Sequence, residues 1–384
     1  MDGKEQIKVF FSIYDSRKIC RNYPYAVKEL IATYIVHTRG KRGNKMDQIR
    51  LGRTNLMVSR SGFGALPIQR ISIQEAGRLL RKAYDWGINF FDTARAYTDS
   101  EEKIGAALAD VRERIIIATK TGAEDRKTFF ENLETSLRNL KTDYIDIYQL
   151  HNPKELPDPN DSEGLYQALL EAKNKGMIRF IGITNHRLDL AIAAADSGLY
   201  DTVQYPLSLL SHDKDLGLID LCEEKDIGLI AMKALSGGLI NNGRAAFAFL
   251  RQYQNVVPIW GVQREFELDE FLACEQKPPQ LDEAMRQIIN QYRTELSGEF
   301  CRGCGYCLPC PAEIPIPMAA RMGLFLNRAV YQSFLTDEWR KQMDLIDNCI
   351  NCGHCREHCP YELDTPELLK KNLQTYREFS RKHS

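Results

Sequence analysis

Short apolar runs rich in β-branched residues alternate with amphipathic helical runs from about residue 59 to residue 276. The strand-like runs span 61–67, 88–93, 114–120, 144–151, 178–185, 202–206, 227–234 and 256–261. Several are apolar on both faces, which is typical of parallel strands buried on both sides. Eight β/α units in this length predict a closed (β/α)8 barrel. A doubly wound open sheet is the alternative, but no G-x-G-x-x-G follows the first strand.

Helical runs lie between these strands and end where backbone-permissive residues follow. They span 74–86, 101–110, 127–141, 165–175 and 188–197. Gly87, Gly176, Gly198 and Gly228 are expected to close helices, because glycine readily adopts the left-handed conformation just past a helix end.

The bulk composition excludes several classes of protein. The net charge is −1, so no overall field points to nucleic acid or a membrane surface. No apolar run approaches the roughly 18 residues of a membrane-spanning helix. Many thiols in a chain of this length argue against a secreted disulfide scaffold. We therefore expect a cytoplasmic protein with no nucleic-acid or membrane partner.

Shifts in composition divide the chain into three segments. Residues 1–45 carry ten Lys/Arg against four Asp/Glu without a clear period, and Met46 is followed at once by a strand-like start. We predict that 1–45 is a basic extension upstream of the true start; the alternative is an arm that binds a partner. Residues 46–280 form the predicted barrel, which ends in the linker around Pro278 and Pro279. Residues 281–384 form a mainly helical second domain.

Polar and titratable side chains gather where the predicted strands end. Asp92 ends the second strand and Tyr97 follows it, Lys120 ends the third, and His151 ends the fourth. In (β/α)8 barrels the carboxyl ends of the strands form the active-site face, so these four side chains should meet at one mouth. Taken singly, Asp92 could cap a helix, Tyr97 could be a rim aromatic and His151 could be structural.

The local sequence around these residues resembles the aldo-keto reductase superfamily over roughly 47–275. The motifs FFDTARAY…SEEKIG, IATKT, YQLH and IGITN occur in the family's order. The resemblance implies NAD(P)H-dependent reduction of a small-molecule aldehyde or ketone. Tyr97 would donate the proton, with Lys120 lowering its pKa. Asp92 would hold Lys120, and His151 would orient the carbonyl oxygen.

The same resemblance assigns residues to the nicotinamide cofactor. Thr184 and Asn185 after the fifth strand, with Gln204 on the sixth, would hold the carboxamide. Gly261 ends the eighth strand, and the helix that follows would bind phosphate through backbone N–H groups. Arg264 would face a 2′-phosphate or, equally, only solvent. Glu267 and Phe271 stand where relatives commonly have Gln and Asn, so NADP rather than NAD is only the family's preference.

Eight of the eleven cysteines form two runs near the C-terminus, each reading C-x2-C-x2-C and then a Cys-Pro. This is the ligand pattern of bacterial-type ferredoxins, and it predicts two 4Fe-4S clusters. Structural zinc is the rival, but zinc usually takes two Cys pairs. In ferredoxins the fourth Cys of each run serves the other cluster. The two predicted ligand sets are therefore Cys301, Cys304, Cys307 and Cys359, and Cys349, Cys352, Cys355 and Cys310.

Two features depart from that pattern or lie outside it. Only two residues, Leu308 and Pro309, separate Cys307 from Cys310, where three residues are usual. Cys20, Cys222 and Cys274 lie elsewhere and read as plain thiols. A subgroup of aldo-keto reductase-like proteins carries such a tail, and the chain resembles it over nearly all of 47–384.

Three functions stay open at this level. The chain is a carbonyl reductase with auxiliary clusters, an electron-transfer oxidoreductase with a ferredoxin-like partner, or a nucleotide-binding redox sensor. Nicotinamide moves two electrons and each cluster moves one, and no flavin motif links them. The chain leaves the barrel opposite the active site, but sixteen helical residues at 281–296 span roughly 24 Å. We expect this helix to return the second domain to the mouth and cover part of it.

Overall fold

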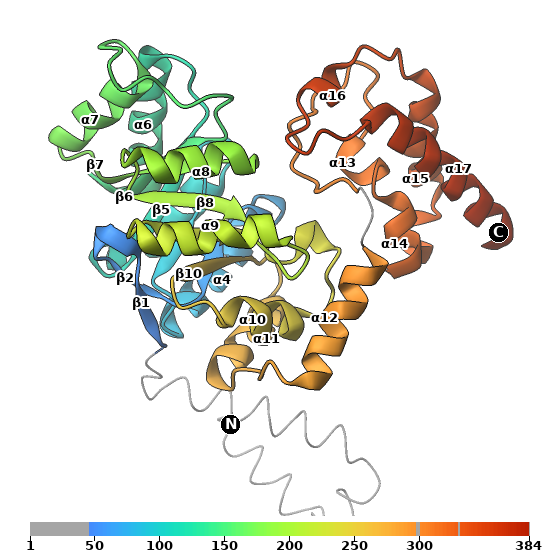
Figure 1. Cartoon of the computed structure of the whole chain (residues 1–384), viewed down its shortest axis with the longest axis horizontal. Coiled ribbons are helices and arrows are strands. Elements are labelled where there is room, and N and C mark those ends of the chain that lie inside the picture. Colours follow the sequence, from blue (N-terminus) through green and yellow to red (C-terminus); the bar gives the residue numbers. More distant parts are fainter. Residues whose placement is uncertain (1–45, 297–299, 329–330, 384) are drawn as a thin grey trace, which may run out of the picture. The chain divides into compact units, whose positions relative to one another are not determined.

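The computed structural model describes residues 46–296, 300–328 and 331–383 (Figure 1). The predicted basic extension at 1–45, which includes Cys20, lies outside the described residues. Within the described part, no helix is long and apolar enough to cross a lipid bilayer.

Eight parallel strands close into a barrel, which confirms the predicted fold class. They are β3 (Gly62–Gly64), β4 (Phe90–Asp92), β5 (Ile116–Thr121), β6 (Ile145–His151), β7 (Ile178–Thr184), β8 (Thr202–Pro206), β9 (Gly228–Met232) and β10 (Val256–Gly261). The last strand, β10, pairs with both β9 and β3, so no edge is left open.

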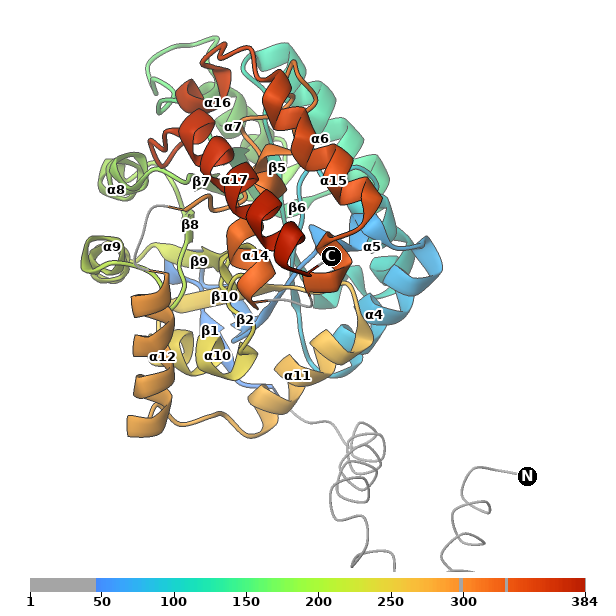
Figure 2. The ribbon, with the colours of Figure 1, turned by 90° about the vertical axis from the view of Figure 1, so that its right-hand side faces the viewer.

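Helices surround these strands, as Figure 2 shows. They are α4 (Ile73–Asp85), α5 (Ser100–Leu108), α6 (Arg126–Leu140), α7 (Leu165–Asn174), α8 (Leu188–Ser197), α9 (Asp213–Glu224), α10 (Gly243–Arg251) and α11 (Glu265–Gln276). Helix α4 turns one apolar stripe inward. In α4 the buried residues are Ala76, Leu79, Leu80 and Ala83, which is the i, i+3, i+4, i+7 spacing of one helix face.

Alternation along the strands fills the barrel interior in layers. Phe90, Ile116, Ile147, Ile230 and Val257 belong to one buried apolar cluster. Further along β4, β5 and β6, the same face carries Asp92 two positions beyond Phe90, Lys120 four positions beyond Ile116, and Gln149 two positions beyond Ile147. A period of two therefore changes an apolar floor into a polar upper layer, and this layer lies at the strands' carboxyl ends.

The predicted strand after Met46 does not join the barrel. It forms a hairpin, β1 (Gln48–Arg50) and β2 (Met57–Ser59), whose Leu51, Leu56 and Val58 join the apolar cluster at the amino end of the strands. Gly228 is explained by this hairpin and not by a helix end, which corrects the prediction for that residue. A Cβ on Gly228 would lie 2.6 Å from Leu51 Cγ, while Asp226 takes the left-handed conformation (φ 53°) after α9.

The C-terminal part belongs to the same compact unit as the barrel and has a core of its own. Its helices are α13 (Ile316–Ala319), α14 (Met322–Arg328), α15 (Asp337–Asp344), α16 (His354–Glu357) and α17 (Thr365–His383). Short 3-10 turns complete the chain: η1 (Gly52–Thr54), η2 (Pro67–Arg70), η3 (Ala109–Arg114), η4 (Ser236–Gly238), η5 (Tyr331–Phe334) and η6 (Leu345–Asn348).

The connecting helix α12 (Glu283–Glu295) ends at the active-site face of the barrel. Arg293 Nε donates to the Leu209 carbonyl at 2.8 Å, and the Tyr292 hydroxyl donates to the Asn241 side chain. Leu209 follows β8 and Asn241 follows β9, so both partners lie beyond the strands' carboxyl ends. The predicted return of the chain to this face is confirmed.

Candidate functional site

Asp92 and Lys120 form a buried ion pair at the end of β4 and β5. Lys120 Nζ lies 2.7 Å from Asp92 Oδ1, with exposed side-chain fractions of 1% and 3%. The same ammonium donates to the Thr93 carbonyl at 2.6 Å. Burial raises the pKa of Asp92 and lowers the pKa of Lys120, while their mutual attraction opposes both shifts.

Tyr97 and His151 lie beside this pair. Lys120 Nζ is 5.3 Å from the centre of the Tyr97 ring, and the Tyr97 and His151 rings meet edge to face with centres 5.9 Å apart. Asp92, Tyr97, Lys120 and His151 therefore share one mouth, although they come from three separate strand ends. The structure places these four side chains together, as their positions at strand ends led us to expect.

The pKa of Tyr97 is shifted in the opposite direction from the sequence-based expectation. It is raised well above its ordinary value of 10, first by burial and then by the negative charge of Asp92. Lys120 does not overcome these effects because its hydrogen bonds go to Asp92 and the Thr93 carbonyl. Tyr97 is therefore a neutral phenol, with a proton to give, throughout the physiological pH range.

His151 is also neutral. Burial and the positive charge of Lys120 lower its pKa from 6.5 to about 3. A neutral imidazole keeps one N–H donor and one acceptor. His151 can thus donate a hydrogen bond to an oxygen in the mouth without placing a full positive charge there.

A network of buried amides fills the layer beside the ion pair. Gln149 Nε2 donates to Gln204 Oε1 at 2.9 Å, and both amides lie 3.5 Å from the Asp92 carboxylate. Gln149 Oε1 and Thr184 Oγ1 are buried without a hydrogen-bond partner among the described residues. Such orphaned polar atoms are costly unless a bound group satisfies them, so this layer fits a polar ligand. Sequence reasoning missed Gln149. The signal that could have found it is the period of two on β6, which puts Gln149 on the same face as His151.

The remaining residues assigned to nicotinamide lie on the neighbouring strands. Thr184 on β7 is the register partner of both His151 on β6 and Gln204 on β8. Asn185 is buried, but its side chain already donates to the Pro153 carbonyl at 2.9 Å and accepts from the Arg187 N–H at 2.8 Å. One amide hydrogen of Asn185 is left for a ligand.

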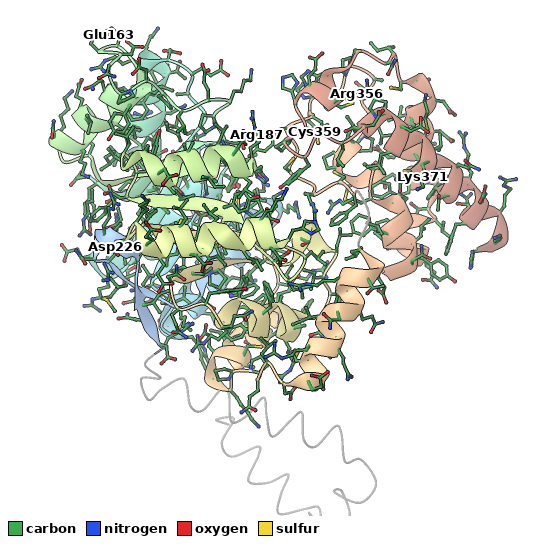
Figure 3. The ribbon with its side chains drawn as sticks, in the orientation of Figure 1. Glu163, Arg187, Asp226, Arg356, Cys359 and Lys371 are labelled. Carbon is green, nitrogen blue, oxygen red and sulfur yellow. The ribbon has the colours of Figure 1, made fainter. Side chains whose placement is uncertain are left out.

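Figure 3 shows Arg187 just past β7, at the opposite end of the barrel from Asp226, which precedes β9.

A carboxylate of the chain lies at the start of α11, where the phosphate site is predicted. Gly261 ends β10 and Arg264 precedes the helix, but the Glu267 carboxylate accepts from the backbone N–H groups of Gln263 and Arg264 at 2.9 and 3.0 Å. The Glu267 carboxylate therefore occupies two backbone N–H groups just before the helix, those of Gln263 and Arg264. Phe271 is buried and stacks on Trp260, with ring centres 4.4 Å apart. It is a packing residue in this structure.

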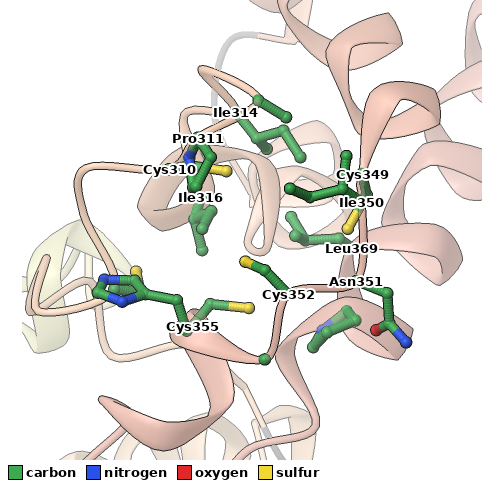
Figure 4. A pocket seen from close by; sticks show the side chains of 15 residues that line it. Cys310, Pro311, Ile314, Ile316, Cys349, Ile350, Asn351, Cys352, Cys355 and Leu369 are labelled. Atoms are coloured by element: carbon green, nitrogen blue, oxygen red, sulfur yellow. The ribbon is translucent and has the colours of Figure 1, made fainter.

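The eight clustered thiols line two hollows. The first hollow is lined by Cys301, Cys304, Cys307 and Cys359, and the second by Cys310, Cys349, Cys352 and Cys355; Cys307 and Cys355 also border the other hollow. Figure 4 shows the second set around a common space, with Leu369 and Ile316 beside it. Thiolates are the donors that iron–sulfur clusters require, so both hollows fit such groups. Among the residues that the structure describes, no three His, Cys, Asp or Glu side chains lie close enough together to hold a single metal ion such as zinc.

Two cationic side chains flank the first hollow. Arg321 donates to the Gly237 carbonyl at 2.7 Å and Lys233 to the Arg302 carbonyl at 3.3 Å. Negative charge on Cys301 and Cys304 acts to raise the pKa of both cations. Gly237 and Lys233 follow β9, so the first hollow lies against the active-site face of the barrel.

Three aromatic residues, His186, Tyr306 and Tyr361, join the first hollow to the mouth; we call them the aromatic bridge. His186 Nδ1 is 2.7 Å from the Tyr361 hydroxyl, and its ring meets Tyr306 edge to face with centres 5.1 Å apart. Sequence reasoning missed all three. Their only signal was position: His186 follows Asn185, and each tyrosine lies within two residues of a cluster cysteine.

Known proteins match both parts of the chain. A sequence model of the aldo/keto reductase family matches residues 61–246, and one of the 4Fe-4S dicluster domain matches residues 300–364. The chain is 28% identical over 218 residues to an aldo-keto reductase from Bacillus subtilis, covering 51% of this chain and 64% of that protein. It is 33% identical over 215 residues to L-galactose dehydrogenase from Arabidopsis thaliana, covering 51% and 67%. The chain thus spans about two thirds of the length of these curated relatives.

Solved structures share the fold. An aldo-keto reductase from Klebsiella pneumoniae, solved in complex with NADPH, gives a TM-score of 0.56 at 22% identity, over 65% of this chain and 95% of that chain. The closed barrel, the family match and the L-galactose dehydrogenase relative agree. The chain belongs to the aldo/keto reductase family and carries a C-terminal 4Fe-4S dicluster domain.

Proposed function

We propose that the chain is an NAD(P)H-dependent carbonyl reductase in which Tyr97 donates the proton. The observation that carries this proposal is the placement of a protonated phenol beside a buried Lys120–Asp92 pair at the barrel mouth. Family membership and the orphaned Thr184 hydroxyl support a nicotinamide bound next to it.

The bound nicotinamide would supply a hydride to the carbonyl carbon. Negative charge then develops on the carbonyl oxygen, and the Tyr97 phenol gives this oxygen its proton. Lys120 stabilises the phenolate that remains, because its ammonium lies 5.3 Å from the ring. His151 donates a hydrogen bond to the same oxygen and aligns it. Thr184, Asn185 and Gln204 would hold the carboxamide, and Gln149 would join them through its unpartnered oxygen.

A steady-state assay tests this function. Protein with reconstituted clusters is mixed anaerobically with NADH or NADPH and a panel of aldehydes and ketones, and nucleotide absorbance at 340 nm is followed. We expect sustained oxidation of the nucleotide only when a carbonyl compound is present, with one alcohol formed per nucleotide oxidised in the steady state. Nucleotide binding without turnover on the whole panel would contradict the proposal.

The rate of reduction should be nearly independent of pH between about pH 5 and pH 9. His151 has its pKa lowered to about 3, so it gains no proton above pH 5, and the pKa of Tyr97 is raised, so it loses none below pH 9. The measurement is kcat against pH in buffers in which the visible cluster absorbance stays constant. A fall centred near pH 6.5 would mean that His151 titrates like a free imidazole.

Glu267 should weaken binding of NADPH relative to NADH. Its carboxylate holds the two N–H groups at the start of α11 that a 2′-phosphate would approach, and like charges repel. Glu267→Gln keeps the size and removes the charge. We expect the Kd of NADPH to fall by about tenfold, or ~1.4 kcal/mol, with the Kd of NADH within twofold.

The matched control for this variant is Glu265→Gln in the same helical turn, whose carboxylate pairs with Lys82 at 2.7 Å. Fluorescence of the bound nicotinamide gives both constants. Equal changes in the two variants would show a general charge effect, and an unchanged NADPH Kd in Glu267→Gln would remove the 2′-phosphate from this site.

We also propose that the two hollows each hold a 4Fe-4S cluster. The exposed surface at the second hollow favours an added electron-transfer role with a ferredoxin-like partner: Cys352 is exposed, and the side chain of neighbouring Ile350 is 68% exposed. Stopped-flow absorbance with NADPH alone tests this role. Bleaching of the cluster absorbance before any carbonyl compound is added would support it, and clusters that stay oxidised would count against it.

A further inference from the structure

Two cationic side chains, Arg321 and Lys233, lie beside the first hollow; we call them the cation pair. Arg321 belongs to the iron–sulfur domain, where it lies between α13 and α14, and it is only 6% exposed. Lys233 belongs to the barrel, directly after β9, and is half-buried. Each domain therefore contributes one positive charge to the boundary between them.

Two glycines, one from each domain, make room for the Arg321 guanidinium. Gly303 lies between Cys301 and Cys304 in the sequence. A Cβ on Gly303 would lie 2.8 Å from Arg321 Cζ, and a Cβ on Gly237 would lie 2.8 Å from Arg321 Nη1, closer than real side chains allow. Both glycines also take the left-handed conformation, with φ of 65° and 67°. The guanidinium thus lies directly against the backbone that joins two of the cluster cysteines.

Backbone carbonyls, and not carboxylates, accept the hydrogen bonds of the cation pair. Arg321 donates to the Pro317 and Gly237 carbonyls at 2.6 and 2.7 Å. Lys233 donates to the Arg302 carbonyl at 3.3 Å. Neither cation forms an ion pair with an Asp or Glu among the residues that the structure describes. A carbonyl satisfies a donor without neutralising its charge, and a buried charge is costly unless an opposite charge accompanies it, so the pair fits an anionic group in the first hollow.

The two hollows differ in the positive charge around them. Besides the cation pair, Arg302 lines the first hollow, and its guanidinium lies over the Phe300 ring at 4.0 Å. In the described part of the chain, no Arg or Lys lines the second hollow. Arg356, next to Cys355 in the sequence, is exposed and already paired with Asp364 at 2.7 Å. Positive charge is therefore concentrated at the first hollow.

We propose that the cation pair is the counter-charge of the cluster in the first hollow and raises its reduction potential. A reduced cluster carries one more negative charge than an oxidised cluster, so nearby cations stabilise the reduced form more. This inference rests on the proposed presence of a cluster in that hollow. Because Lys233 comes from the barrel, the barrel itself helps to set how readily the iron–sulfur domain accepts an electron.

A redox titration of the full chain with reconstituted clusters tests this role. Each cluster takes one electron from dithionite, and EPR follows its reduction at pH 7, where Lys233 is still charged because burial lowers its pKa only to about 8. Arg321→Met and Lys233→Met each remove a charge and keep an unbranched side chain. In either variant we expect the equilibrium constant for reducing one cluster to fall about tenfold, which is ~59 mV for one electron. The other cluster should stay within about twofold of the wild type.

Two further variants serve as controls, and iron content and visible absorbance are measured for every protein. Arg321→Lys keeps the positive charge, so it should recover most of the potential that Arg321→Met loses. Lys371→Met removes an exposed cation on α17, whose charge water and salt screen. Both clusters of Lys371→Met should match the wild type, which a general effect of net charge on the domain would prevent.

The outcomes separate this inference from the proposed clusters. A wild-type protein without iron–sulfur clusters after reconstitution overturns both. If two clusters are present, but Arg321→Met and Lys233→Met change neither potential or both equally, the role of the cation pair alone is overturned. If Arg321→Met loses iron, Lys233→Met decides: a lowered potential of one cluster supports the inference, and unchanged potentials overturn it, because Arg321 then only packs the domain.

Discussion

Tyr97→Phe should lower kcat for carbonyl reduction by about 10²–10⁴-fold, the range over which a positioned general acid contributes. The ring stays in place against His151, but the mouth loses the proton that the carbonyl oxygen must receive. His151 cannot replace it, because an imidazole with a pKa of about 3 becomes a strong acid only after protonation that rarely occurs at neutral pH. The Kd of NAD(P)H should stay within twofold, since Tyr97 is not among the residues assigned to the carboxamide.

The control for this variant is Tyr84→Phe, which removes a phenol from α4 on the outside of the barrel. Kinetics with one good carbonyl substrate, together with nucleotide fluorescence and iron content, give the comparison. A Tyr97→Phe protein that kept more than about a tenth of the wild-type kcat would place the proton donor elsewhere. Equal losses in both variants would indicate damage to the fold.

The barrel and its polar layer were predictable because they follow from periodicity. Strand alternation puts Asp92, Lys120 and Gln149 on one face at the carboxyl ends of β4, β5 and β6, and a closed parallel barrel brings those ends together. Local sequence therefore indicated the Asp92–Lys120 pair before any distance was known. The direction of the Tyr97 pKa was not predictable in this way, because it depends on burial, which the sequence does not state.

Contacts between the two domains could not be predicted from periodicity. The hydrogen bond between Tyr361 and His186 joins residues 175 positions apart, and no periodic pattern relates them. The carboxylate of Glu267 was visible as a departure from the family, but its use as a cap on the N–H groups of Gln263 and Arg264 depends on the conformation of the turn after β10. Both features depend on tertiary geometry, and the position of Glu267 also changes which nucleotide the site is expected to bind.

Replacing the fourth cysteine of either run should remove one whole iron–sulfur cluster. If these cysteines cross between the clusters, Cys359→Ala should remove the cluster of the first hollow and Cys310→Ala that of the second, and each variant should lose about four of eight irons. The hollows support crossing, because Cys359 lines a space with Cys301 and Cys304, while Cys310 lines one with Cys349 and Cys352. The short spacing before Cys310 does not prevent this arrangement.

Double variants distinguish crossed from uncrossed ligation, because iron loss is additive only across different clusters. Cys304 lines only the first hollow, so Cys304→Ala combined with Cys359→Ala should lose no more iron than either single variant. Cys304→Ala combined with Cys310→Ala should lose nearly all of it. Iron per chain and the EPR signal of the reduced protein measure this, with Cys222→Ala, a buried thiol on α9, as the control. The reverse pattern would mean that each run binds its own cluster, and that Tyr361 is not tied to the cluster nearest the active site.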